Sequence, residues 1–223
     1  MRRVLLLLAA TALTVLLAAC GPGTEPTTPS PDVTVTAPSP TPTPTPTPTA
    51  PPALADLAIS ADGLGTLLLG NAPDTDPATA MIVEDPEACV SAGATPGTPE
   101  ALRWRPIPLY FGSLYEYFGV EVSGGVVRRV DVFDDTIPTD AGIRIGDTRA
   151  AALAAYPDAT ITSNQLADIL LITGDHGSLQ VEIATNDPYW DASQANHVRY
   201  IHASVVLEPF SVVASENLAG GCL

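Results

Sequence analysis

The sequence predicts an α+β fold in which two tandem units, each a short helix packed on an antiparallel β-sheet, follow a proline- and threonine-rich tether. Three observations predict this fold. Similar segments recur in the same order in both halves, one segment alternates strictly between polar and apolar residues, and another carries helix start and stop signals. We therefore divide the chain into a leader (1–19), a tether (20–52), a first α+β unit (53–135) and a second α+β unit (136–223).

The repeat rests on three pairs of short segments. Residues 67–70 match 143–146, residues 120–122 match 181–183, and residues 127–132 match 198–203. Each match alone is weak, because short apolar alternations are common in strands. The shared order favours a duplication over a coincidence, and the different offsets imply insertions in the loops.

The second unit has the more regular pattern. Asp147 is a good N-cap for a helix over residues 148–155, where alanines favour helix, and Pro157 ends it. A strand at 168–173 precedes a glycine turn. In the strand at 178–184, residues 179, 181 and 183 are apolar whereas 178, 180 and 182 are polar, which is typical of a half-buried antiparallel strand. Further strands are expected at 198–207 and 210–213.

The first unit has a similar but less regular pattern. Asp76 is expected to cap a short helix with Pro77 at its first position. Trp104 is expected to begin a strand. Leu114, Phe118, Val120 and Val122 share one face of another strand, and residues 123–125 form a hairpin turn into a strand at 126–133.

The N-terminus resembles a bacterial lipoprotein signal. Arg2 and Arg3 precede a short apolar run that ends in Leu17-Ala18-Ala19-Cys20, which looks like a lipobox. The resemblance implies diacylation of Cys20 and cleavage before it, so the protein is expected at the outer face of the bacterial cell membrane, held by an N-terminal lipid anchor. An ordinary signal peptide with a chance cysteine is the alternative. The run is shorter than the ~20 residues of a membrane-spanning helix.

The tether contains twelve prolines between Gly21 and Pro52, mostly in Thr-Pro and Ser-Pro pairs. Proline removes a backbone donor and fixes φ, so this composition predicts an extended polyproline II segment. At ~3.1 Å per residue it could span roughly 100 Å. Its threonines either carry O-linked sugars or belong to a plain spacer.

Cysteine usage and charge narrow the classes of function. With Cys20 assigned to the lipid, Cys89 and Cys222 remain as a pair in an oxidising compartment, and we expect a disulfide between them in preference to two free buried thiols. The net charge is −16, there is no lysine, and cleavage of the leader would bring the side-chain charge to −18. Such a chain is a poor match for nucleic acid.

Two sequence patterns resemble known families. Residues 62–65 (Asp-Gly-Leu-Gly) and the run from Ile143 to Leu153, followed by Tyr156-Pro157, look like uncharacterised lipoproteins of high-GC Gram-positive bacteria. The order of glycine, polar cap, helix and meander also resembles the tandem module of the β-lactamase inhibitory proteins and the small outer-membrane assembly lipoproteins (SmpA/OmlA). The resemblance implies a curved sheet that presents a protein-binding face. No inhibitory contact residue can be matched to this chain, so inhibition is not carried over.

The sequence offers no catalytic motif, cofactor motif or metal-ligand spacing. His197 and His202 lie five residues apart in an expected strand and therefore on opposite faces, and His176 lies in a turn beside Asp175. Asn186, Asp187 and Asp191 do not have the spacing of a calcium loop. We therefore predict no catalytic residues, no metal and no cofactor.

The leading expectation is a non-enzymatic module that binds an envelope protein or a glycan. Tyr189 and Trp190 lie in a loop that is longer in the second unit than in the first, and such aromatic residues are favoured at interfaces. Alternatively, Trp190 folds back and closes the core. The other functions that we consider are a cell-envelope hydrolase with unidentified carboxylates and a purely structural spacer domain.

Overall fold

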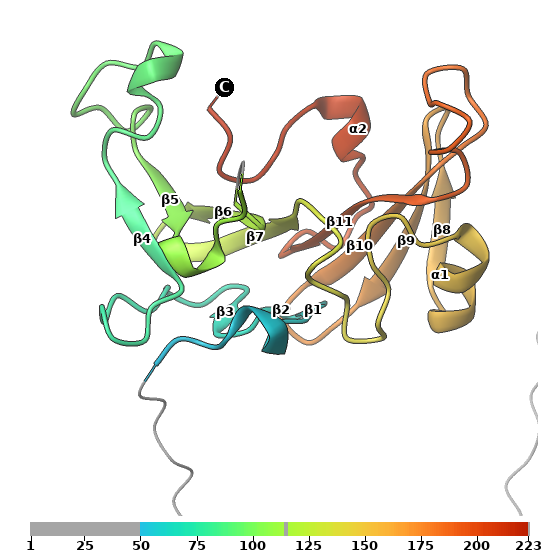
Figure 1. Cartoon of the computed structure of the whole chain (residues 1–223), viewed down its shortest axis with the longest axis horizontal. Coiled ribbons are helices and arrows are strands. Elements are labelled where there is room, and N and C mark those ends of the chain that lie inside the picture. The colour runs from blue at the N-terminus through green and yellow to red at the C-terminus, as the bar shows by residue number, and fades with distance from the viewer. Residues whose placement is uncertain (1–49, 114–115, 223) are drawn as a thin grey trace, which may run out of the picture. The chain divides into compact units, whose positions relative to one another are not determined.

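The structure is a computed structural model that describes residues 50–113 and 116–222 (Figure 1). The predicted leader, Cys20, Leu114 and the tether up to residue 49 lie outside the described residues, so the lipid anchor stays a prediction. Among the residues that the structure describes, no helix has the length and apolar composition that crossing a membrane requires.

A six-stranded antiparallel sheet organises the described part of the chain. Its strands lie in the order β6-β7-β11-β10-β9-β8, so β6 and β8 form the two edges. The fold is therefore α+β with more strand than helix. The strands of this sheet are β6 (Phe118–Ser123), β7 (Val126–Val132), β8 (Thr160–Ser163), β9 (Ala167–Thr173), β10 (Ser178–Ala184) and β11 (Val198–Ser204).

The two predicted units contribute to this one sheet. The β6–β7 hairpin from the first half pairs through β7 with β11 from the second half, with Val132 opposite Ile201. Two of the three sequence matches fall on equivalent strand pairs, β6–β7 and β10–β11. The third does not, because residues 67–70 include β3 whereas residues 143–146 form no strand. A common origin of the two halves stays a prediction.

Smaller elements cover one face of the sheet and form the main hydrophobic core with it. A three-stranded sheet of β1 (Ile59–Ser60), β2 (Gly63–Leu64) and β3 (Leu67–Leu68) packs against β7, β10 and β11 (Figure 1). The helix α1 (Arg149–Ala155) buries Ala152 in the same core. A separate ribbon of β4 (Ile82–Asp85) and β5 (Arg103–Pro106) lies next to β6, and the predicted strand at Trp104 is confirmed.

Local chemistry explains which predicted elements form. Gly124 and Gly125 have φ of 63° and 79°, as the tight turn of the β6–β7 hairpin requires. The N-cap of α1 is Thr148 and not Asp147, since the Thr148 hydroxyl accepts the Ala151 N–H at 3.2 Å. The predicted helix at Asp76 is wrong. Asp76 caps only one turn, because Met81 and the residues after it are drawn into the core and into β4.

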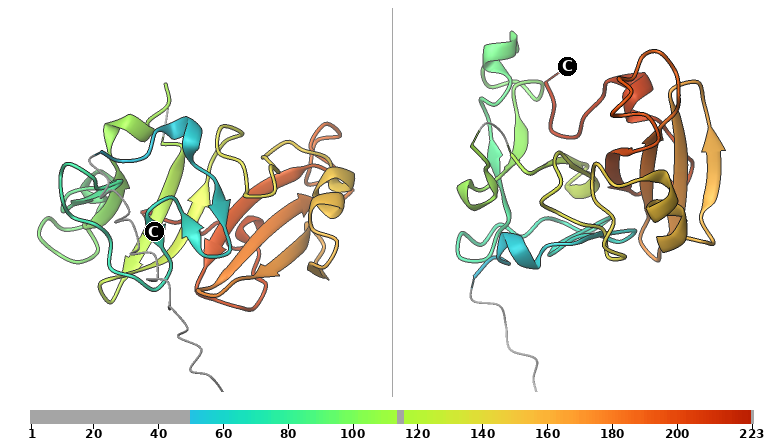
Figure 2. Two further views of the ribbon diagram at one scale, coloured as in Figure 1. Left: turned by 90° about the horizontal axis from the view of Figure 1, so that it is seen from below. Right: turned by 45° about the vertical axis from the view of Figure 1, so that its right-hand side comes forward.

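The chain ends in a segment that crosses the other face of the sheet, which we call the C-terminal strap (residues 205–222). It contains the short helix α2 (Val212–Ser215), where a strand was predicted (Figure 2). The expectation that β10 has an exposed polar face is also wrong. Every residue of β10 is buried, the polar ones included, because the strap lies over them.

The predicted disulfide is confirmed. Cys89 and Cys222 are bonded, with their Cα atoms 5.4 Å apart and a sequence separation of 133. Cys89 is buried in the loop between β4 and β5, so the bond attaches the end of the strap to that loop. The strap is therefore held at both ends, by β11 at its start and by the disulfide at its end.

We predict that replacing both cysteines by serine (Cys89→Ser with Cys222→Ser) destabilises the protein by at most about 5 kcal/mol, as expected for a closed loop of this length. Urea unfolding of the wild type and the double variant measures the difference in unfolding free energy. Equal stabilities would contradict the structural role that we give to the bond.

Candidate functional site

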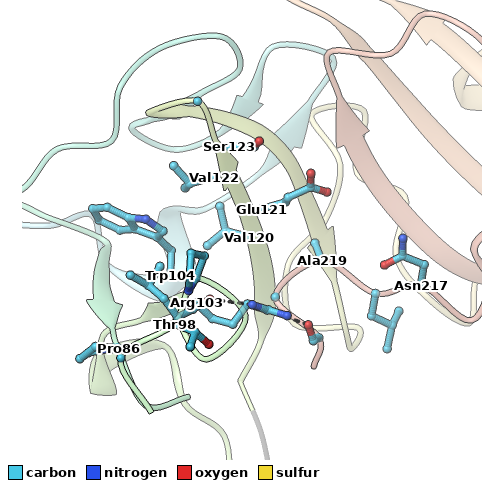
Figure 3. Close-up of a pocket in the computed structure, with 17 residues that line it drawn as sticks. Pro86, Thr98, Arg103, Trp104, Val120, Glu121, Val122, Ser123, Asn217 and Ala219 are labelled. Atoms are coloured by element: carbon cyan, nitrogen blue, oxygen red, sulfur yellow. Dashed lines mark hydrogen bonds between the residues drawn. The ribbon is translucent and has the colours of Figure 1, made fainter. Parts of the chain in front are cut away.

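An open groove lies beside β6 in the described part of the chain, and we call it the β6 groove. Its volume is about 710 Å³, within the range of small-molecule and peptide sites (Figure 3). Three segments build it, namely the loop and first residues of the β4–β5 ribbon, the second half of β6, and the end of the strap. Its side chains include Thr98, Leu102, Arg103, Trp104, Val120, Glu121, Val122, Ser123, Asn217 and Leu218.

The groove combines an aromatic wall with aliphatic and polar groups. The Trp104 indole lies across the groove from Val120 and Val122 (Figure 3). Leu218 of the strap is 40% exposed and lines the groove. The mixture of apolar surface with a few polar groups is typical of a binding site.

The backbone of β6 presents a free sheet edge to the groove. The Phe133 N–H donates to Tyr117 O at 3.0 Å, so the ladder bonds to β7 fall on residues 117, 119 and 121. The N–H and C=O of Val120 and Val122 must then point away from β7. Among the described residues, no backbone hydrogen bond from outside the sheet reaches Val120 or Val122.

The β6–β7 hairpin contains a bulge, but the N–H and C=O of Val122 still point away from β7. The register between β6 and β7 shifts after Glu121, and Val122 lies opposite Val127. The backbone N–H and C=O of Val127 bond to Asn71 and Gly70 at 2.8 Å each, so they do not face β6. Val122 and Val127 are therefore a non-hydrogen-bonded pair, and Val122 offers one donor and one acceptor to the groove.

The strap crosses the sheet at the start of the groove. A Cβ on Gly119 would lie 2.1 Å from Ala219 O, so only glycine allows the strap to cross β6 at this point. Gly220 then passes beside the backbone of Val120 without a hydrogen bond to it. Arg103 holds the strap here by donating from Nε to Gly221 O at 2.9 Å (Figure 3). The strap thus covers the edge at Val120 and leaves Val122 open.

We predict that Val122→Pro leaves stability nearly unchanged, because it removes an N–H that faces the groove and takes no part in the sheet ladder. Glu121→Pro is the matched control, since the Glu121 N–H faces β7, and it should lower the melting temperature clearly more. Thermal unfolding of the two variants measures this. The reverse order would show that the edge assignment is wrong.

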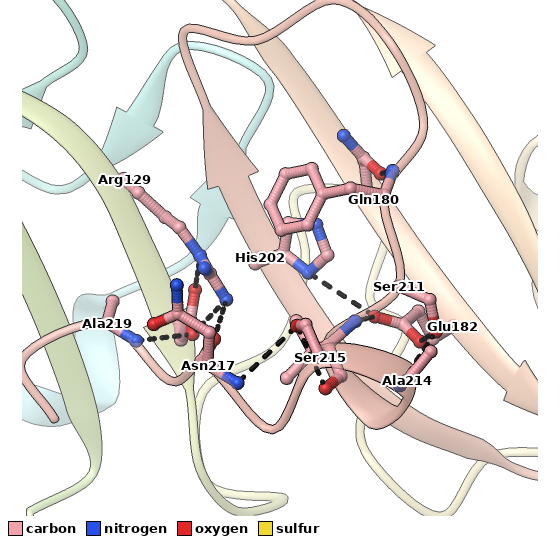
Figure 4. A network of polar contacts seen from close by, with 12 residues as sticks. Arg129, Gln180, Glu182, His202, Ser211, Ala214, Ser215, Asn217 and Ala219 are labelled. Carbon is pink, nitrogen blue, oxygen red and sulfur yellow. Dashed lines mark hydrogen bonds and ion pairs between the residues drawn. The ribbon is translucent and has the colours of Figure 1, made fainter. Parts of the chain in front are cut away.

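A second polar cluster lies between the strap and the sheet, and it holds the strap in place (Figure 4). Gln180 accepts from Phe210 N at 3.0 Å and donates to Glu208 O at 3.2 Å. Glu182 accepts from the hydroxyl of Ser211, the N-cap residue of α2, at 2.8 Å and from Val212 N, the first backbone donor of α2. These side chains of β10 thus replace the backbone partners that an added strand would supply.

Arg129 and Asp131 of β7 hold the later part of the strap. The two side chains form a bidentate ion pair with both distances at 2.6 Å, and both are nearly inaccessible to solvent. Arg129 also donates to Asn217 O at 3.0 Å, and Asp131 accepts from Ala219 N at 2.8 Å. Removing one member would leave an uncompensated buried charge, so this pair fixes the position of the strap beside the groove.

Burial changes the acid–base properties of this cluster. Desolvation raises the pKa of Glu182 and, although Arg129 acts against it, also that of Asp131. Desolvation together with the positive charge of Arg129 lowers the pKa of His202 well below its usual value. His202 is therefore neutral near pH 7, and its approach to Glu182 at 4.0 Å is not a salt bridge.

His202 is the one residue of this cluster whose buried side-chain nitrogens lack hydrogen-bond partners. Both ring nitrogens are buried without a hydrogen-bond partner, and the ring packs on Phe210 of the strap with centroids 4.4 Å apart. Burying unpaired polar atoms costs free energy. The ring contributes packing beneath the strap, and protonation would place an unpaired charge there.

We predict that His202→Leu raises the free energy of unfolding at pH 7 by about 1–3 kcal/mol, because it removes the unpaired nitrogens. The folded pKa of His202 is depressed, so below pH 6.5 the unfolded chain binds a proton that the folded chain excludes. Wild-type stability should therefore fall relative to that of the variant as the pH decreases from 6.5. Glu182 and Asp131 act in the opposite direction but are common to both proteins. A constant difference across this pH range would contradict the buried neutral histidine.

The structure separates the two aromatic residues that the sequence singled out. Trp190 folds back on the sheet, where its indole N–H donates to Leu166 O at 2.7 Å and its ring packs with Ile169 and Val213. Tyr189 is 59% exposed and contacts Trp190 edge to face with centroids 5.0 Å apart. Trp190 therefore has a packing role, and Tyr189 remains a predicted contact residue on a surface away from the β6 groove.

The other polar candidates do not come together. His176 pairs with Asp62 at 3.3 Å instead of its neighbour Asp175. His202 lies under the strap, whereas His197 precedes β11 in an isolated bridge with Thr148. In the described ranges, no three histidine, cysteine, aspartate or glutamate side chains are grouped so that they could hold a metal ion.

Sequence reasoning missed the β6 groove. Trp104 was assigned to a strand, and Val122 and Leu218 were given no functional role. One sequence signal for it was present, because a disulfide between Cys89 and Cys222 requires the last residues to lie beside the loop that precedes Trp104.

Comparisons with models of protein families, with curated proteins and with solved structures find no match for this chain. The resemblance to the β-lactamase inhibitory protein module stays a prediction, and the function must be argued from the site itself.

Proposed function

We propose that this protein is a lipid-anchored extracytoplasmic binding module that holds an extended segment of a partner protein in the β6 groove. Cys20 anchors it to the membrane, the tether projects it, and the described residues supply the site. The observation that carries this proposal is the free backbone edge of Val122 within a groove that has an aromatic wall. An extended peptide can pair with such an edge and place alternate side chains in the groove.

The position of the groove also supports the proposal. Exposed sheet edges promote aggregation, and proteins usually cover or charge them. Here the strap covers Val120, and Glu121 places a charge on the strand, but the edge at Val122 stays accessible. A partly protected edge limits pairing to short segments that fit between Trp104 and the strap.

The alternative of a cell-envelope hydrolase needs two carboxylates that face one cleft. The buried carboxylates Asp131 and Glu182 belong to β7 and β10, which are separated by β11 and so lie about 10 Å apart. Both accept backbone N–H groups of the strap. Glu121 is the one carboxylate among the described residues that line the groove, so no pair there favours hydrolysis.

We predict that Leu218→Asp and Trp104→Ala abolish or strongly reduce cross-linking of the anchored protein to its envelope partner, because they remove apolar contact area at the centre of the site. Leu218 is partly exposed, so its variant should fold normally even if Trp104→Ala is destabilised. Tyr189→Ala is the control for the distant loop. Loss of the partner with Tyr189→Ala alone would instead favour the loop as the binding surface.

A further inference from the structure

The charge around the β6 groove is unbalanced. Pro86 of the groove lies between Asp85 and Glu87, Glu100 precedes the ribbon, and Glu121 lines the groove itself. Glu87, Glu100 and Glu121 are exposed, whereas Asp85 is half-buried opposite Arg103 in the ribbon. One carboxylate thus lines the groove and three more belong to residues next to its lining in sequence, whereas the described lining contributes one cation, Arg103.

Arg103 is the one cation that lines the groove in the described residues, and backbone carbonyls of the strap and the loop accept hydrogen bonds from its Nε and Nη1. Its Nε bonds to Gly221 O at 2.9 Å, and its Nη1 bonds to Leu102 O at 2.7 Å and to Glu100 O at 3.1 Å. The guanidinium therefore acts as a brace between the ribbon and the end of the strap. The nearby Arg105 is paired with Glu116. The four carboxylates in and next to the groove lining thus outnumber its one cation, Arg103, and the chain as a whole has a net charge of −16.

The aromatic wall favours the same class of ligand. An indole face attracts lysine ammonium and arginine guanidinium groups, and this attraction increases when water is excluded from the contact. Trp104 is half-buried and faces the groove, across from the open edge at Val122 (Figure 3). A strand that pairs with Val122 would direct alternate side chains into the groove, where they meet Trp104 and the carboxylates.

We propose that the occupant of the β6 groove is an extended cationic peptide segment, which adds to the edge of β6 at Val122 and places a lysine or arginine side chain between Trp104 and the acidic rim. This proposal rests on the proposed function and specifies the chemistry of the partner. The negative field increases the rate of encounter with such a segment, the backbone edge fixes its direction, and Trp104 selects the cation.

The test uses the full anchored chain purified in an uncharged detergent. Isothermal titration calorimetry compares a short peptide of alternating lysine and valine with one of alternating glutamate and valine. We expect the lysine peptide to bind at least about tenfold more tightly, and its affinity to fall as salt screens the rim. Glu121→Gln should weaken it about two- to threefold, as expected for one exposed charge pair. The matched control Asp158→Asn, an exposed carboxylate in the loop after α1, should leave affinity unchanged.

Three outcomes would overturn the proposal in different ways. Equal affinity of the two peptides, with both weakened by Trp104→Ala and Val122→Pro, would reject the cationic partner but support the groove as the binding site. Tight binding of the lysine peptide that neither variant changes would show attraction to the acidic surface elsewhere and would reject the groove as well. Binding of neither peptide would reject the cationic strand and count against the proposed function.

Discussion

The structure depends on hydrogen bonds between buried polar side chains of the sheet and the backbone of the C-terminal strap. Gln180 and Glu182 of β10 point toward a face that the sequence pattern assigned to solvent, and Arg129 and Asp131 of β7 point the same way. Each of the four bonds to a strap N–H or C=O. Buried polar groups cost free energy unless they are paired, so these side chains and the strap require one another. Unlike apolar packing, these bonds also fix the position of the strap along the sheet.

The groove follows from this arrangement. The Arg129–Asp131 pair positions Asn217 and Ala219, the missing side chain of Gly119 lets the strap cross β6, and the disulfide fixes Cys222 to the loop before β5. The residues between these points form one wall of the groove, and Trp104 and β6 form the others. The binding site that we propose thus depends on the position of the C-terminal strap. Its walls come from segments that include residues about a hundred positions apart in the sequence.

Sequence reasoning predicted the local features and missed the long-range ones. The alternation of residues 178–184, the Gly124–Gly125 turn and the cysteine pair each have a local or compositional signal, and each prediction of a strand, turn or disulfide is confirmed. The burial of Glu182 could not be predicted, because a polar residue in an alternating strand indicates solvent unless something covers it. The strap covers Glu182. Residues 210–213 of the strap have the pattern of a strand, but the Glu182 carboxylate of β10 accepts from Val212 N and caps a short helix there.

The same limit applies to the site. The sequence indicates Tyr189 and Trp190 as contact residues, because aromatic residues in a long loop are favoured at interfaces. In the structure, however, Trp190 packs on Ile169 and Val213. Trp104 has the same residue type but lies beside a sheet edge, which is a property of strand order and cannot be read from residue type. Strand order in turn depends on the pairing of β7 with β11, a contact between the two halves that a tandem-unit interpretation does not anticipate.

Amide hydrogen exchange read by mass spectrometry tests most directly whether the strap and the sheet form one structure. We predict that the hydrogen-bonded amides of residues 205–222 exchange as slowly as those of β10 and β11 while the disulfide is intact, because the strap and the buried polar face can open only together. Mild reduction should then release the residues after Ala219, which Asp131 still holds, and leave α2 protected by Glu182. Rapid exchange of the whole strap in the oxidised protein, with β10 and β11 still protected, would contradict the account.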